Sequence, residues 1–143
     1  MSAPRYRAWR FLHPDLDFGE EAPGLRIAPT GAIDMVEEHA AVRQAVLLLL
    51  TTMPGERVMR PEYGCDLHRL AFSPNDDTTA GLAIYYVRRA LERWEPRIQL
   101  LHEDAGRSPE EAYRLDVTVD YRVRATQRGD RFVYPFTLAG GAR

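Results

Sequence analysis

Two prolines and two glycines fall within residues 51–65, Thr-Thr-Met-Pro-Gly-Glu-Arg-Val-Met-Arg-Pro-Glu-Tyr-Gly-Cys, so this segment cannot form a single helix. Pro54 lacks a backbone donor, and Pro61 moves the residue before it away from helical backbone angles. Gly55 and Gly64 supply the positive φ angles that tight reversals need. We therefore expect a stiff, extended connector, whose charged side chains suit contact with another protein better than catalysis.

The composition indicates one globular domain with a single core. The chain has 143 residues, of which 45% are hydrophobic and 28% are charged. Its net charge of -2 gives no reason to expect nucleic acid or an anionic membrane as a partner. Four arginines gather near the C-terminal end: Arg122, Arg124, Arg128 and Arg131. Acidic residues lie among them, so they do not predict a nucleic-acid surface.

The number of cysteines and the hydropathy of the chain indicate the cellular compartment in which the protein is expected. Cys65 is the single cysteine, so no intrachain disulfide can form and a reducing compartment is expected. Because it follows a glycine in a turn, it is expected to pack rather than to react. The N-terminal arginines precede no apolar stretch, and the longest apolar run, residues 45–50, is too short to span a bilayer. A cytoplasmic protein without membrane insertion is therefore expected.

Two parts are predicted along the chain. Residues 1–24 are expected to form an extended N-terminal arm, and residues 25–143 a single α+β domain. The arm region is rich in proline, glycine and acidic residues, which is typical of a segment that runs over a surface. Residues 6–12 within it are predicted to form a short strand.

Two helices are predicted in the domain. The first begins at Asp34, which forms a capping box with Glu37, and ends at Pro54. A short helical turn follows at residues 66–72. The second helix spans residues 77–94, and the residues before it provide a turn and an N-cap.

The C-terminal third alternates between apolar and polar residues and predicts strands at residues 97–103, 113–124 and 131–138. Residues 104–112 are expected to be a loop, and residues 125–130 the turn of a hairpin. Pro135 cannot donate to a ladder, so the last strand is expected to be an edge or to turn its prolyl position outward. The predicted fold class is α+β, with two helices packed on a small antiparallel or mixed sheet that ends in a C-terminal β-hairpin.

A search for chemistry predicts no catalytic residue, no metal and no cofactor. The sequence holds no phosphate loop, no paired metal-ligand spacing and no serine elbow. The three best-placed carboxylates each have a nearby arginine: Glu56 with Arg57, Glu62 with Arg60, and Glu95 with Arg97. A neighbouring arginine lowers the pKa of a carboxyl group, whereas a glycosidase acid needs a raised pKa. We interpret these acids as ion-pair partners.

A family resemblance rests on two stretches, LLLLTTMPGERVMRPEYGCDLHRLAFSPND at residues 47–76 and ALERWEPRI at residues 90–98. Within them, Pro-Gly-Glu-Arg, Arg-Pro-Glu-Tyr-Gly and Glu-Pro-Arg are specific at this spacing. The chain resembles the baseplate-wedge family, which includes the wedge protein of T-even phages, the W protein of P-two type phages and the TssE subunit of type VI secretion. It is most similar to the version in extracellular contractile injection systems. The resemblance covers roughly residues 25–138.

The resemblance implies a structural role. Family members sit in the inner ring of a contractile baseplate, about six copies around the tube, and contact heterotrimeric wedge proteins near the Glu-Pro-Arg element. Their sheet is similar to the attachment domain of the sheath protein, so they would template the first sheath layer by β-strand augmentation. Such a protein would assemble in the cytoplasm, become part of a phage tail-like particle, and possess no nucleic-acid partner.

The resemblance also implies which residues bind partners. Glu95, Pro96 and Arg97 would form the core of the wedge contact, with Arg57, Arg60 and Tyr63 as support. Apart from the resemblance, three aromatic residues on the inward face of the predicted last strand are also candidates for partner binding: Phe132, Tyr134 and Phe136. For the arm, contact with a neighbouring baseplate protein or with tube and hub proteins is expected.

Two other hypotheses stay open. The T-even relative carries a lysozyme label, so a peptidoglycan-cleaving enzyme is the alternative, and it would depend on Glu95. A free-standing adaptor domain is the third hypothesis. The residues themselves do not separate a phage tail, a secretion system and a released injection particle.

Overall fold

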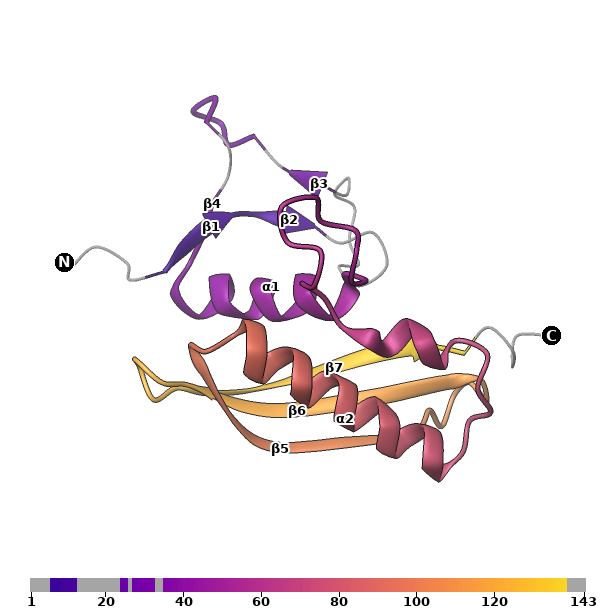
Figure 1. Ribbon diagram of the computed structural model, residues 1–143. Coiled ribbons are helices and arrows are strands. Elements are labelled where there is room, and N and C mark those ends of the chain that lie inside the picture. The colour runs from indigo at the N-terminus through magenta and orange to yellow at the C-terminus, as the bar shows by residue number, and fades with distance from the viewer. Residues whose placement is uncertain (1–5, 13–23, 26, 33–34, 139–143) are drawn as a thin grey trace. The chain divides into compact units, whose positions relative to one another are not determined.

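The computed structural model describes residues 6–12, 24–25, 27–32 and 35–138 (Figure 1). The chain divides into two compact units, Met1–Ala45 and Val46–Arg143. Helix α1, Glu38–Thr51, begins in the first unit and ends in the second. No helix among the described residues has the length and apolar character needed to cross a membrane.

The first unit contains two short antiparallel strand pairs. Strand β1, Arg7–Trp9, pairs with β4, Met35–Glu37. Strand β2, Phe11–Leu12, pairs with β3, Gly24–Leu25. The strand predicted at residues 6–12 is thus present, in two pieces.

The amide side chain of Gln44 in α1 fixes these strands to the helix. Its Oε1 accepts from the Phe11 N–H at 2.8 Å, and its Nε2 donates to the Trp9 carbonyl at 2.6 Å. One amide therefore satisfies a donor and an acceptor of the β1–β2 segment, which is how a short strand at a chain end becomes anchored.

The predicted start of the first helix was wrong. Met35–Glu37 is a strand, so Glu37 cannot be part of a capping box, while Asp34 lies outside the described residues. The Glu38 N–H donates to the Tyr6 carbonyl at 2.7 Å, and Glu38 has a φ of 51°, which reverses the backbone from strand into helix. Pairing with β1, which is distant in sequence, overrides the local helical pattern here.

The second unit is built around α2, Asp77–Trp94, which has the predicted bounds. Asp76 caps its N-terminus, because the side-chain Oδ1 accepts from the Thr79 N–H at 2.9 Å. This hydrogen bond also lowers the pKa of Asp76. The short helical turn expected before it is a 3-10 helix, η1, at Asp66–Leu70.

Helix α2 lies along one face of a three-stranded antiparallel sheet (Figure 1). The strands are β5, Ile98–Arg107, β6, Arg114–Val123, and β7, Gly129–Thr137, in the order β5-β6-β7. Every second residue of β6 is buried: Leu115, Val117, Val119, Tyr121 and Val123. This row covers the core side of the sheet, so the α+β class and the C-terminal hairpin are confirmed.

Strand β5 is longer than predicted, because a bulge interrupts its pattern. The register with β6 shifts between Leu100 and His102, and the Leu101 side chain is left 49% exposed. The extra residue shifts the alternation of inward and outward side chains by one position. A strand predicted from strict alternation starting at residue 98 therefore stops before the true end of β5. The predicted loop at 104–112 is strand as far as Arg107, which pairs with Leu115.

The hydrogen-bond phase of β7 fixes which backbone groups face outward. Two backbone hydrogen bonds mark the ends of the β6–β7 ladder. The Val123 N–H donates to the Arg128 carbonyl at 2.9 Å, and the Leu138 N–H donates to the Tyr113 carbonyl at 2.8 Å. Since hydrogen-bonded pairs alternate, Pro135 occupies a non-hydrogen-bonded position and its nitrogen points away from β6. The expected outward prolyl position is confirmed.

The connector between α1 and η1 was predicted to be extended, but it folds back on itself through a series of turns. The Cys65 N–H donates to the Thr52 carbonyl at 2.9 Å, and the Gly55 N–H donates to the Pro61 carbonyl at 2.6 Å. Gly64 has a φ of +140°, and a Cβ atom there would lie 2.5 Å from the Thr52 oxygen. A side chain at residue 64 is therefore excluded by backbone that cannot move aside.

We predict that Gly64→Ala lowers the free energy of unfolding by about 3 kcal/mol, because strained backbone angles and a clash with backbone oxygen add together. Gly55→Ala is the matched control, since Gly55 has a φ of +98° but a Cβ atom added there would meet nothing within 4 Å. That control should lose only about 1 kcal/mol. Urea denaturation measures both, and equal losses would contradict the close approach.

Candidate protein-docking site

The connector and the end of α2 are joined through aromatic rings. The Tyr63 ring meets the Trp94 ring edge-on, with centroids 5.4 Å apart at an angle of 65°. The guanidinium of Arg57 lies over the Tyr63 ring at 4.4 Å, and that of Arg93 lies over the Trp94 ring at 4.8 Å. Such cation–π and edge-to-face contacts fix orientation as well as position.

Glu95 and Arg97 form a two-point ion pair directly after α2. The Arg97 Nε and Nη2 atoms donate to the two Glu95 carboxylate oxygens at 2.6 and 2.9 Å. The Glu95 side chain is only 6% exposed, whereas that of Arg97 is 33% exposed. Arg97 thus neutralises the buried carboxylate of Glu95, while part of the Arg97 guanidinium stays accessible to solvent.

The backbone of this element is held by Arg124, which follows β6. The Arg124 N–H donates to the Arg97 carbonyl at 2.9 Å, and its Nε donates to the Pro96 carbonyl at 3.2 Å. Pro96 itself is exposed. The Glu-Pro-Arg element is therefore a rigid corner between helix, strand and hairpin.

The predicted wedge-contact residues come together in space. The pKa of Tyr63 is raised, mainly by burial of its ring. Charged residues nearby also act on it: Arg57, Arg60 and Arg97 act to lower this pKa, and Glu95 acts to raise it. Three separate sequence elements thus converge on one tyrosine. We call this group, Arg57, Arg60, Tyr63, Glu95, Pro96 and Arg97, the corner site.

The aromatic residues predicted on β7 lie elsewhere. They pair in register with buried residues of β6, so they share the covered face of the sheet. Phe132 is 5% exposed, and Tyr134 and Phe136 are half-buried with ring centroids 6.5 Å apart. These three aromatic side chains therefore pack on the core side of the sheet rather than forming a separate exposed surface.

The ion-pair interpretation is confirmed for two of the three acids, Glu62 and Glu95, one of them with a changed partner. Glu95 pairs with Arg97 as predicted, but Glu62 pairs with Arg93 of α2 rather than with the nearby Arg60. Sequence reasoning also missed Arg88 and Glu103, which join α2 to β5 by two hydrogen bonds of 3.0 and 2.9 Å. Both missed pairs link residues that are distant in sequence, so neighbour spacing gives no signal for them.

Cys65 is a packing residue in the structure. It is 2% exposed, and its Sγ lies 3.6 Å from the Tyr86 carbonyl. Burial raises the pKa of the Cys65 thiol to about 11, which is opposite to the change that activates a nucleophile. Within the described ranges, no three His, Cys, Asp or Glu side chains are grouped so that they could hold a metal ion.

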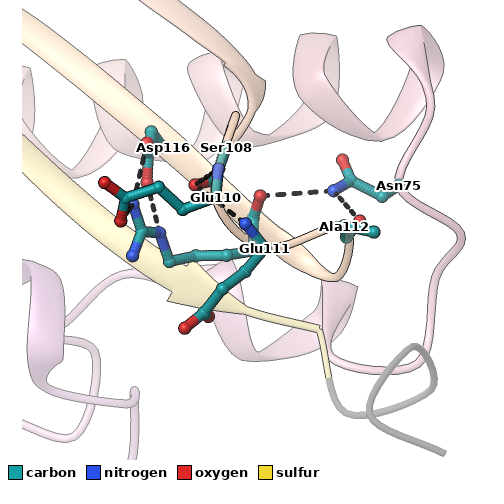
Figure 2. Close-up of polar contacts among 7 residues, drawn as sticks. Asn75, Ser108, Glu110, Glu111, Ala112 and Asp116 are labelled. Atoms are coloured by element: carbon teal, nitrogen blue, oxygen red, sulfur yellow. Dashed lines mark hydrogen bonds and ion pairs between the residues drawn. The ribbon is translucent and has the colours of Figure 1, made fainter.

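A second polar cluster holds the β5–β6 loop in place (Figure 2). The Ser108 Oγ accepts from the N–H groups of Glu110 and Glu111 at 3.2 and 3.4 Å. The Asn75 Nδ2, just before α2, donates to the Ala112 carbonyl at 2.8 Å. These bonds satisfy backbone groups of a tight loop, so the cluster is structural.

Comparison with solved structures gives the class of protein. The chain is similar to a subunit in the cryo-EM structure of the anti-feeding prophage baseplate, with a TM-score of 0.64 and 25% identity over 94% of this chain and 86% of that chain. The fold described above is thus similar to that of a subunit of a contractile baseplate. The family model of baseplate wedge protein gp25 matches residues 36–128, and the chain belongs to this family.

Two further relatives agree with that assignment. Baseplate wedge protein gp25 of Enterobacteria phage T4 is 33% identical over 61 residues, which are 43% of this chain and 46% of the phage protein. The chain thus matches less than half the length of that relative. A crystal structure from Geobacter sulfurreducens, described as a candidate tail lysozyme, is 44% identical, covers 73% of this chain and 96% of its own, and has a TM-score of 0.64.

The family predicted from the sequence motifs is therefore confirmed. With it, the chain is a baseplate wedge component of a contractile, phage tail-like particle.

Proposed function

We propose that the chain docks on baseplate wedge proteins through the corner site and templates the first sheath layer at the β7 edge. About six copies would surround the tube, assembled in the cytoplasm. Residues 25–143 would act as one wedge-like domain, and the arm at 1–24 would contact a neighbouring baseplate or tube protein. The partners come from the family resemblance, and the observation that carries the proposal is the β7 edge.

The β7 edge supports the templating role. Among the described residues, β7 forms a ladder with β6 alone. Its odd-numbered positions turn their backbone groups away from β6, and the Val133 side chain is 49% exposed. An edge of this kind can accept a strand from another chain through main-chain hydrogen bonds. Pro135 removes one outward donor, so pairing would centre on Val133 and resume at Thr137.

We predict that Val133→Pro weakens sheath attachment on the order of tenfold, because it removes an outward donor and places a ring on the edge. No hydrogen bond to β6 is lost, since Val133 lies at a non-hydrogen-bonded position opposite Thr118. The measurement is the amount of sheath that co-purifies with baseplates carrying the variant. A point substitution is needed, because deleting β7 would also remove the buried Phe132 from the core.

Two controls separate backbone pairing from side-chain effects. Val133→Ala shortens the same side chain but keeps the N–H, and should attach sheath normally. Pro135→Ala adds an outward donor and should attach sheath at least as well as the unchanged protein. Normal sheath assembly on Val133→Pro would contradict templating at this edge.

The corner site supports the wedge-docking role. It combines an exposed proline, an ion pair with one open side, and the exposed arginines Arg57 and Arg60 on an anchored connector. Because the buried Glu95 needs Arg97, reversing Arg97 would damage the fold as well as any interface. Arg60 is the cleaner probe, because its side chain is exposed and the connector is anchored without it.

We predict that Arg60→Glu weakens binding to the wedge proteins on the order of tenfold, through charge repulsion at the interface. Its stability should stay within about 0.5 kcal/mol of the unchanged protein, as for surface substitutions generally. Co-purification with the wedge proteins and thermal denaturation are the measurements. Arg107→Glu, at the other end of β5, makes the same charge change and should bind normally. Equal binding by Arg60→Glu and Arg107→Glu would argue against the corner site.

A lysozyme activity is the second candidate, favoured by the description of the Geobacter relative. The general acid of a glycosidase needs a raised pKa and a free carboxyl group. Both Glu95 oxygens are instead engaged by a guanidinium. We therefore propose a structural protein that is not an enzyme.

We predict that the purified, folded protein releases no more soluble product from peptidoglycan than its Glu95→Gln variant does. The measurement is turbidity loss of a purified cell-wall suspension, with an active lysozyme as the positive control. Turnover that disappears in Glu95→Gln would restore the enzymatic hypothesis.

A further inference from the structure

The tip of the connector presents two apolar side chains to solvent. Val58 is 94% exposed and Met59 is 90% exposed, which are the highest values among the large hydrophobic residues described. The tip is a closed turn, because the Arg60 N–H donates to the Arg57 carbonyl at 3.2 Å. Single exposed apolar residues are common on protein surfaces, but an adjacent pair at the tip of a turn is a feature that needs a cause.

The base of the same connector is anchored at several points. Cys65 and Gly64 are buried, and the Gly55 N–H is bonded to Pro61 across the base. Tyr63 packs on Trp94, and Glu62 is paired with Arg93. The tip is therefore displayed on a fixed support, and docking it would cost little conformational entropy.

The charged residues next to the tip indicate what kind of partner surface could accept it. Arginines stand on both sides of the apolar pair, Arg57 before it and Arg60 after it, and both are exposed. The guanidinium of Arg57 is held over the Tyr63 ring, so its position is set before any partner arrives. A surface that accepts this turn has an apolar pocket for two side chains and carboxylates at its rim.

We propose that Val58 and Met59 form a hydrophobic plug that inserts into an acid-rimmed apolar pocket on a wedge protein. This inference rests on the proposed wedge docking. It adds a contact whose burial of apolar surface would contribute to the binding free energy. The corner site orients the chain, and the plug is the anchor buried at the centre of the interface. Small, buried apolar anchors surrounded by polar contacts are the usual source of interface affinity.

Methionine oxidation tests the plug without any substitution. Met59 should be converted to its sulfoxide rapidly by dilute hydrogen peroxide in the isolated protein, and on the order of tenfold more slowly in assembled particles. Met53 is an internal reference, being 44% exposed and in a different tryptic peptide, since cleavage follows Arg57. Equal oxidation of Met59 in both samples would overturn the inference. Protection already present in the isolated protein would also overturn it, because the tip would then be covered by this chain or a second copy.

Two double variants test the energy of the contact. V58S/M59S should keep the thermal stability of the unchanged protein and bind the wedge proteins on the order of tenfold more weakly. V58I/M59L keeps the apolar volume and should bind normally. Normal binding by V58S/M59S overturns the plug. If Arg60→Glu still weakens binding in that case, wedge docking stands without it, whereas normal binding by both variants would remove the proposed docking site as well.

Discussion

The closure of the connector between Thr52 and Gly64-Cys65 is the constraint on which the corner site depends. The Cys65 N–H reaches the Thr52 carbonyl, and Gly64 passes so close to this backbone that no side chain fits. This closure brings Tyr63 against Trp94 and places the charged turn beside the end of α2. Without it, a segment with two prolines and two glycines would have no reason to hold one conformation.

The buried ion pair of Glu95 and Arg97 contributes orientation more than stability. A carboxylate that is 6% exposed loses hydration, and its partner guanidinium only offsets that loss. The two hydrogen bonds nevertheless fix the direction in which the chain leaves α2 and enters β5. We interpret the pair as the reason that the Glu-Pro-Arg element is rigid, since Pro96 between them also restricts Glu95.

Sequence reasoning predicted the elements whose signals are local. The cap at Asp76, the helix that follows it and the alternation of β6 each carry their pattern within one segment, and their bounds were predicted closely. The start of α1 and the end of β5 failed because a distant strand and a bulge at Leu101 decide them. For the site, motif resemblance named the residues of the corner, but the partner of Glu62 is set by folding. Val58 and Met59 gave no periodic signal and were not singled out.

The corner site and the β7 edge are parts of one continuous framework. Arg124 is bonded to the backbone of both Pro96 and Arg97, and it directly follows β6, which pairs with β7 along its length. A load applied at the β7 edge would therefore pass through hydrogen-bonded strands to the corner without crossing a flexible linker. If the proposed sheath and wedge contacts are correct, this short hydrogen-bonded path from β7 to the corner would connect them without a flexible segment.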